Sequence, residues 1–212
     1  MTTFRCALAT FFLLILAIAA PPALGQVHST DAVSPLQLPS NAGPRVALET
    51  SLGKIVVELY PEKAPRTVGN FLAYVRDGHY NGTIFHRVIA DLLIQGGAFT
   101  PDLQQKPERA PVANESNNGL SNLRGTLAAA RRHSESNSAT AQFFINTVDN
   151  RQLDYRGDGN PAMTGYCVFG RVVEGMDIVD KIRVVATGAR APFPGDVPVS
   201  AVLLERAFVV EP

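Results

Sequence analysis

The chain has 212 residues, with 19 basic and 19 acidic side chains and no formal net charge at pH 7. A neutral chain lacks the basic surface that nucleic acid binding requires, so nucleic acid is not an expected partner. Without the leader described next, the chain is long enough for one domain with a substantial core but too short for two ordinary domains.

The first 25 residues have the features of a secretory signal peptide. A single positive charge at Arg5 precedes an apolar run over residues 7–20, and the small residues Ala23 and Gly25 follow it. We expect cleavage before Gln26 and export of the remainder. A retained membrane anchor is the alternative, but the run is short for a membrane span. No membrane association is expected once the leader is removed.

Residues 26–43 are rich in Ser, Pro, Asn and Gly and show no periodicity. This composition indicates a flexible tether before a domain of residues 44–212. Because Cys6 lies in the leader, Cys167 is alone in the mature chain and cannot form an intrachain disulfide. Cys167 lies in an apolar run, so we expect burial in a strand and not a reactive thiol.

A hairpin and a helix are predicted at the start of the domain. Two short β-branched segments, residues 46–49 and 54–59, are separated by a Ser-Leu-Gly turn. Apolar residues then recur at i, i+3, i+4 and i+7 from Val68 onward, after Pro65 and before Gly78. This pattern is typical of an amphipathic helix with ordinary start and stop signals.

Strands are predicted for most of the remaining domain. Short apolar segments bounded by Gly, Asn, Asp or Pro occur at residues 84–89, 92–95, 126–129, 142–146 and 168–173. A second helix is predicted over residues 175–183, and a last strand over residues 199–210 closes the sheet. The expected fold is mainly β, a closed antiparallel β-barrel with helices covering its ends, which leaves no free strand edges.

Metal and hydrolytic chemistry find little support in the sequence. The histidines His28, His79, His86 and His133 are scattered, and none is paired with Cys, Asp or Glu at ligand spacing, so no metal site is expected. There is no Gly-x-Ser-x-Gly elbow, and the pair Gly96-Gly97 lacks the spacing of a phosphate-binding loop. A secreted hydrolase whose triad forms only in space is left as an alternative.

An arginine, a glutamine and two phenylalanines lie on three successive predicted strands. Arg87 is on the first, Gln95 on the second, and Phe143 and Phe144 on the third. Such a set can bind a peptide and an apolar ring. By spacing alone, Arg87 is explained equally well as a rim arginine in a structural salt bridge. Strand alternation sends only one of the two phenylalanines toward a ligand.

The ordered motifs FHRVI, IQGGAF, AQFFIN and YCVFGRVVEGMDIVDKI make residues 46–210 resemble the cyclophilin family of peptidyl-prolyl isomerases. The stretch NESNNGLSNLRGTLAAARR is similar to the bacterial periplasmic branch, in agreement with the leader. The resemblance implies an eight-stranded barrel capped by two α-helices, and an isomerase of X–Pro bonds in the periplasm. Implied partners are proline-containing, unfolded or partly folded polypeptides, and we expect a monomer without a cofactor.

Carried over residue by residue, the resemblance implies a site. Arg87 matches the family's catalytic arginine, and Phe144 matches the floor of its proline pocket. Gln95 matches the glutamine before the glycine pair, and we expect it to hold the guanidinium group of Arg87. The other implied substrate-binding residues are Leu92, Leu93, Ala130, Arg131, Gln142, Gln152, Leu153 and Tyr166.

Two positions depart from the family's pattern. Leu92 stands where the family usually has Phe, and Gln152 stands where it has Trp or, in many bacterial members, Phe. Both changes remove an aromatic face, so cyclosporin is expected to bind weakly. A non-catalytic peptide-binding chaperone, which would keep the pocket without turnover, is therefore the alternative function.

Overall fold

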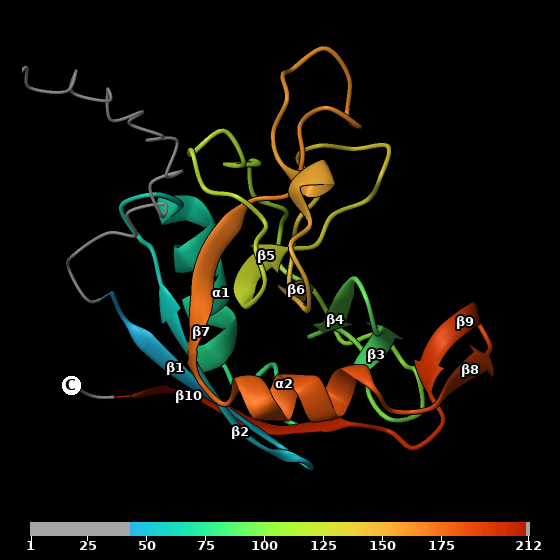
Figure 1. Ribbon diagram of the computed structural model, residues 1–212. Coiled ribbons are helices and arrows are strands. Elements are labelled where there is room, and N and C mark those ends of the chain that lie inside the picture. The colour runs from blue at the N-terminus through green and yellow to red at the C-terminus, as the bar shows by residue number, and fades with distance from the viewer. Residues whose placement is uncertain (1–42, 211–212) are drawn as a thin grey trace, which may run out of the picture. The chain divides into compact units, whose positions relative to one another are not determined.

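A computed structural model describes residues 43–210 of the protein. In this range eight strands close an antiparallel barrel in the order β1-β10-β3-β4-β6-β5-β7-β2 (Figure 1). The strands are β1 (Arg45–Thr50), β2 (Gly53–Leu59), β3 (Thr83–Ile89), β4 (Leu93–Gly96), β5 (Thr126–Ala129), β6 (Phe143–Asn146), β7 (Val168–Glu174) and β10 (Leu203–Val210). The predicted barrel is confirmed. The leader predicted for residues 1–25, and the predicted tether apart from its last residue, lie outside the described residues.

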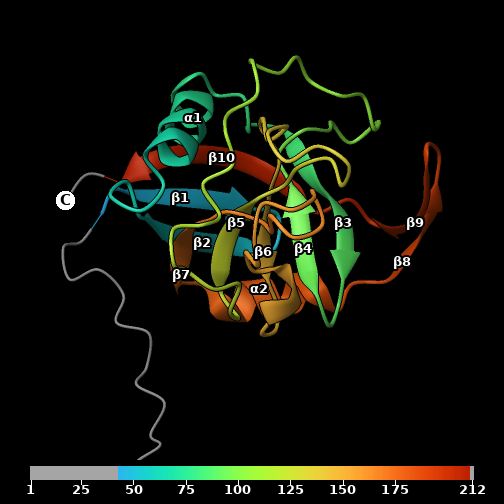
Figure 2. The ribbon, with the colours of Figure 1, turned by 90° about the horizontal axis from the view of Figure 1, so that it is seen from above.

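Two helices cover the barrel, as predicted. Helix α1 (Pro65–Arg76) begins with proline in its first turn and buries the apolar face predicted from Val68 onward. It ends at Arg76, two residues before Gly78, whose positive φ of 65° stops a helix. Helix α2 (Met176–Arg183) buries Ile178, Val179 and Ile182, and in Figure 2 it lies on the opposite side of the barrel from α1. Of the helices within residues 43–210, none is long and apolar enough to cross a membrane.

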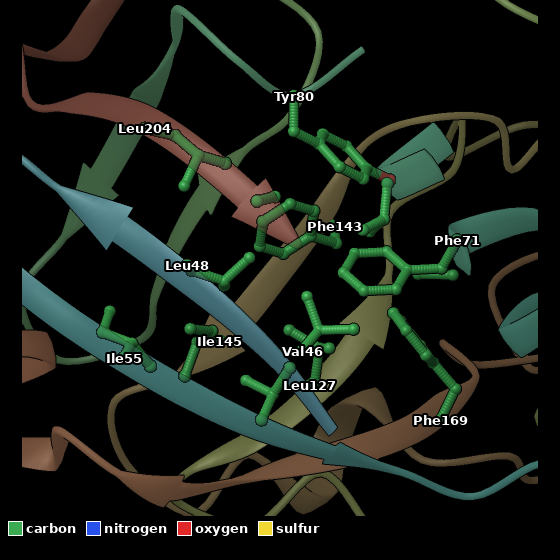
Figure 3. Packing of buried hydrophobic residues seen from close by; sticks show 14 of the residues in the cluster. Val46, Leu48, Ile55, Phe71, Tyr80, Leu127, Phe143, Ile145, Phe169 and Leu204 are labelled. Atoms are coloured by element: carbon green, nitrogen blue, oxygen red, sulfur yellow. The ribbon is translucent and has the colours of Figure 1, made fainter. Parts of the chain in front are cut away.

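The inward-facing side chains of the strands fill the barrel together with the apolar face of α1 (Figure 3). Phe143 lies at the centre of this core, with its ring centroid 5.5 Å from those of both Phe71 and Tyr80. Such edge-to-face aromatic pairs add to the stabilisation from buried area. The predicted burial of Cys167 is confirmed, because it is 2% exposed just before β7. Burial raises the pKa of its thiol to about 12, so the thiol is unreactive.

A second hairpin between α2 and the last strand is absent from the sequence prediction. Strands β8 (Thr187–Arg190) and β9 (Phe193–Pro198) form a separate two-stranded sheet beside β3 (Figure 1). The last barrel strand accordingly begins at Leu203, later than predicted. Three prolines and two glycines between residues 187 and 198 hide the apolar alternation that marks a strand. The hairpin is held by the packing of Val197 and Phe193 against Ile84 of β3.

Candidate active site

A bulge in β3 directs Arg87 out of the barrel. The register pairs Phe85 with Gly96 and Arg87 with Gln95, so His86 is an extra residue on the β3 side. Phe85 and Val88 consequently both face the core, and the two residues between them face away from it. A strict alternation would instead have placed Arg87 on the same side as Phe85. Bulges often re-aim a side chain next to a functional site in this way.

The neighbouring strands present a small apolar surface on the same outer side. Leu93 of β4, Ala128 of β5 and Phe144 of β6 form a cluster separate from the barrel core. Their chain neighbours Leu127 and Phe143 face inward and belong to that core. The prediction that the two phenylalanines point to opposite sides of the strand is therefore confirmed.

A cavity of about 410 Å³ lies over this surface. Its floor is apolar, and the basic side chains of Arg87 and Arg131 also line it. The cavity brings together every predicted site residue except Gln142 and Gln152, and it adds one residue that was not predicted, His133. The lining consists of Arg87, Leu92, Leu93, Gln95, Ala130, Arg131, His133, Phe144, Leu153 and Tyr166.

Arg131 connects the loops on one side of the cavity. Its guanidinium carbon lies 4.7 Å from the ring centroid of Tyr166, and that ring meets Phe144 edge to face at 5.6 Å. The side chain also donates four hydrogen bonds to backbone carbonyl oxygens, of Arg132 (3.0 Å), His133 (3.3 Å), Pro161 (2.6 Å) and Gly165 (2.9 Å). The donors of Arg131 are thus engaged by the protein itself.

Gln95 does not hold Arg87, contrary to the expectation. Its amide Nε2 donates to Oε1 of Gln142 at 2.9 Å, and the two glutamines line an adjoining cavity of about 250 Å³. The group beside Arg87 is Asp196 of β9, whose Oδ2 lies 3.5 Å from Nε of Arg87. A carboxylate attracts a guanidinium group more strongly than a neutral amide does, and the hairpin that carries Asp196 was not foreseen.

His86 lies on the same strand as Arg87 but is 2% exposed. Its ring packs against Phe99 and Phe193, with centroids 4.6 Å and 5.5 Å away. Burial, followed by the nearby charge of Arg87, lowers the pKa of His86 to about 4. The imidazole is therefore neutral near pH 7 and adds no charge beside the guanidinium group.

Gln152 lies outside the cavity lining. It belongs to the 3₁₀ turn η1 (Arg151–Leu153), is exposed, and donates to Oδ1 of Asn150 at 3.1 Å. The next residue, Leu153, does line the cavity. One turn of this kind directs adjacent side chains to different sides, which sequence spacing alone does not reveal.

Residues 45–206 match the sequence model of one family, the cyclophilin type peptidyl-prolyl cis-trans isomerase/CLD. The chain is similar to peptidyl-prolyl cis-trans isomerase cyp18 of Streptomyces antibioticus, at 55% identity over 78% of this chain and 98% of that protein. It is also similar to peptidyl-prolyl cis-trans isomerase B of Escherichia coli, at 53% identity over 78% of this chain and 99% of that protein. Peptidyl-prolyl cis-trans isomerase A of Dickeya dadantii is 45% identical over 87% and 94% of the two chains.

Among solved structures, the fold is similar to a cyclophilin type isomerase of Cryptosporidium parvum. The TM-score is 0.67 at 23% identity, over 80% of this chain and 98% of that chain. A second structure of that protein, in the presence of the dipeptide Ala-Pro, has a TM-score of 0.66 at 24% identity, over 79% and 99% of the chains. At this identity the likeness concerns the fold alone.

Proposed function

This chain belongs to the family of cyclophilin type peptidyl-prolyl cis-trans isomerases, and we propose that Arg87 carries its catalysis by donating a hydrogen bond to the prolyl nitrogen. The protein is a peptidyl-prolyl cis-trans isomerase. Rotation about an X–Pro bond is slow because amide resonance sets a barrier of about 18–20 kcal/mol. A catalyst therefore has to favour the twisted amide, in which the nitrogen becomes pyramidal and regains its lone pair.

The surroundings of Arg87 support this role. Its side chain is 44% exposed and lines the cavity. Among residues 43–210, the guanidinium group of Arg87 donates no hydrogen bond, and its shortest contact with the carboxylate of Asp196 is made by Nε at 3.5 Å. A donor that acts on the nitrogen lone pair stabilises the twisted amide and not the planar one, which is the differential binding that catalysis requires. A guanidinium group that donates no hydrogen bond within residues 43–210, at the edge of an apolar cavity, is the observation that carries the proposal.

The apolar floor is proposed to hold the proline ring. Phe144 is 2% exposed and Leu93 is 5% exposed, so both are fixed by packing, and Leu153 closes the cavity from the loop side. With the ring held there, the residue before proline is free to turn. Membership of the peptidyl-prolyl isomerase family supports proline-containing polypeptides as the substrate class.

The remaining site residues are proposed to contact the substrate along the rim of the cavity. Gln95 and Gln142 present amides that are linked to each other, and they join the proline cavity to its neighbour. Gln152 is proposed to act from outside the cavity lining, next to Leu153. The other members of this rim are Leu92, Ala130, Arg131 and Tyr166.

We further propose that the enzyme acts in the periplasm as a monomer, on exported proteins whose folding is limited by proline isomerisation. The apolar run and the small residues at positions 23 and 25 support a cleavable leader. The similar isomerases of Escherichia coli and Dickeya dadantii are bacterial proteins. Fractionation of cells that produce the full chain tests this: most of the protein should be periplasmic and should lack residues 1–25, and an uncleaved protein would contradict it.

The test of the catalytic role is Arg87→Ala, assayed on a blocked X–Pro peptide. We expect kcat/KM to fall about 100-fold, the usual cost of removing one preorganised donor, with no change in the thermal unfolding midpoint. Arg206→Ala is the matched control, because Arg206 is also a strand arginine in an exposed ion pair, with Glu49 at 3.0 Å. Unchanged turnover of correctly folded Arg87→Ala would refute the assignment.

A further inference from the structure

The residue beside Arg87 comes from the β8–β9 hairpin, outside the barrel. Asp196 lies on β9, and its carboxylate Oδ2 is 3.5 Å from Nε of Arg87. Both side chains are about half exposed, at 46% and 44%. Among residues 43–210, Asp196 is the acidic partner of this guanidinium group, and buried His86 is neutral near pH 7.

The backbone holds Asp196 in an uncommon conformation. Its φ is 63°, in the left-handed region that non-glycine residues rarely adopt, although Asp and Asn tolerate it better than most. Residues in this conformation persist where the surrounding structure fixes them, often at functional sites. Here the position is fixed by the next residue, Val197, which is 2% exposed.

The hairpin is seated firmly on the outer side of β3. Val197 packs with Ile84 and Leu103 in an apolar cluster, and the ring of Phe193 meets that of Phe99 edge to face at 5.1 Å. The same two aromatic rings enclose His86, the residue before Arg87. Asp196 is therefore held at a defined place relative to Arg87 by packing that does not involve either charged side chain.

We propose that Asp196 is a positioning residue, which holds the Nε edge of Arg87 so that the terminal nitrogens face the substrate. This inference rests on the proposed function of Arg87. An unrestrained arginine loses considerable rotamer entropy when it is ordered, and an ion pair formed before the substrate arrives reduces that loss. Asp196 touches neither the proline nor the amide, so it acts through Arg87.

Asp196→Gly and Asp196→Asn are the variants that test this, because both residues tolerate a positive φ whereas alanine would strain the hairpin. We expect kcat to fall about two- to fivefold in Asp196→Gly, the range for a half-exposed ion pair, with KM nearly unchanged. Asp196→Asn keeps a hydrogen-bond acceptor without the charge, and its kcat should lie between those of the wild type and Asp196→Gly. Asp177→Asn, which removes an exposed ion pair with Lys181 on α2, is the control and should match the wild type.

The decisive measurement repeats Asp196→Gly in an Arg87→Lys background. Lysine has no Nε edge to be held, so the effect of Asp196→Gly should disappear there. The same fold-change in both backgrounds, or a wild-type kcat in Asp196→Gly, would overturn the inference. If Arg87→Ala is inactive while Asp196→Gly is fully active, only the positioning role fails. If Arg87→Ala itself retains full activity, the proposed function fails first.

Discussion

Arg87 and Arg131 line the same cavity, yet their guanidinium groups are engaged very differently. Arg131 donates four hydrogen bonds to backbone carbonyls and stacks on Tyr166. Within residues 43–210, Arg87 makes one ion pair, with Asp196, in which Nε is the nearest nitrogen. An arginine that lines a pocket therefore does not necessarily have hydrogen-bond donors available to a ligand. Its donors must not already be bonded within the protein, and of the two arginines that line this cavity only Arg87 donates no hydrogen bond within residues 43–210.

The two arginines belong to two walls of the cavity. The strand wall consists of Arg87, Leu93, Gln95 and Phe144, on β3, β4 and β6. The loop wall consists of Arg131, His133, Leu153 and Tyr166. Sheet hydrogen bonds fix the backbone of the strand wall, whereas hydrogen bonds from Arg131 fix much of the loop wall. We therefore expect chemistry to depend on the first wall and the shape of the cavity on the second.

The largest expected effect is the difference between alanine substitutions of the two arginines. Arg131→Ala removes four hydrogen bonds, each worth about 0.5–1.5 kcal/mol net, so its thermal unfolding midpoint should fall clearly while the kcat of the folded variant changes little. Arg87→Ala should show the reverse, a loss of about 100-fold in kcat/KM without a change in stability. Calorimetry and the isomerase assay on both variants check this. Equal losses of activity in two folded variants would remove the distinction between the walls.

A second contrast concerns histidine, with His86 buried behind the strand wall and His133 exposed on the loop wall. The pKa of His86 is lowered from 6.5 to about 4 in the folded protein. Below pH 6.5 the unfolded chain takes up a proton there that the folded chain does not accept until about pH 4. The resulting stability is present above pH 6.5 and is lost as the pH falls, by about 3 kcal/mol in total.

His86→Leu should remove this part of the acid dependence, because leucine does not titrate and Nδ1 of His86 has no partner within residues 43–210. The free energy of unfolding is measured by urea denaturation between pH 7 and 4. Over this pH range the free energy of unfolding should fall by about 3 kcal/mol less in the variant than in the wild type. Identical curves for the variant and the wild type would contradict the shifted pKa.

The predictability of the two walls from sequence differs for physical reasons. Phe143 and Phe144 were assigned to opposite sides because alternation along a strand is a local rule. The outward direction of Arg87 depends on the bulge at His86, which exists only in the pairing of β3 with β4. Asp196 was missed because its hairpin is rich in proline and glycine, and no pattern marks it as a neighbour of Arg87.

The fold was largely predictable, and the loop wall was not. The first hairpin and α1 follow from local patterns, and the barrel follows from short strands that need partners for their edges. Leu153, Arg131 and Tyr166 came from the family resemblance alone. No sequence pattern indicated that His133 lines the cavity, because its loop is irregular and its position depends on a hydrogen bond from Arg131. Gln152 is turned away from the cavity lining by the 3₁₀ turn η1, which sequence spacing does not reveal either.

A smaller effect is expected from restoring an aromatic ring at Gln152. This exposed residue lies beside Leu153 of the loop wall, and tryptophan there would offer a flat face to a ligand in the cavity. One aromatic contact is worth about 0.5–1.5 kcal/mol, so Gln152→Trp should bind cyclosporin up to about tenfold more tightly than the wild type, which we expect to bind it weakly. Titration calorimetry measures the dissociation constants. Gln152→Ala should show no gain, and an equal gain in both variants would speak against the aromatic contact.

The smallest effect concerns the hydrogen bond between Gln95 and Gln142 on the strand side. Gln142→Ala leaves the amide of Gln95 without this acceptor, a loss of about 1 kcal/mol that should raise KM several-fold. Gln142→Glu retains an acceptor at the same place and should preserve KM. Because Gln95 is not bonded to Arg87, kcat should be unchanged in both variants. A selective fall of kcat in Gln142→Ala would mean that the glutamine pair orients Arg87 after all. The orientation of the Arg87 guanidinium group would then depend on more than Asp196.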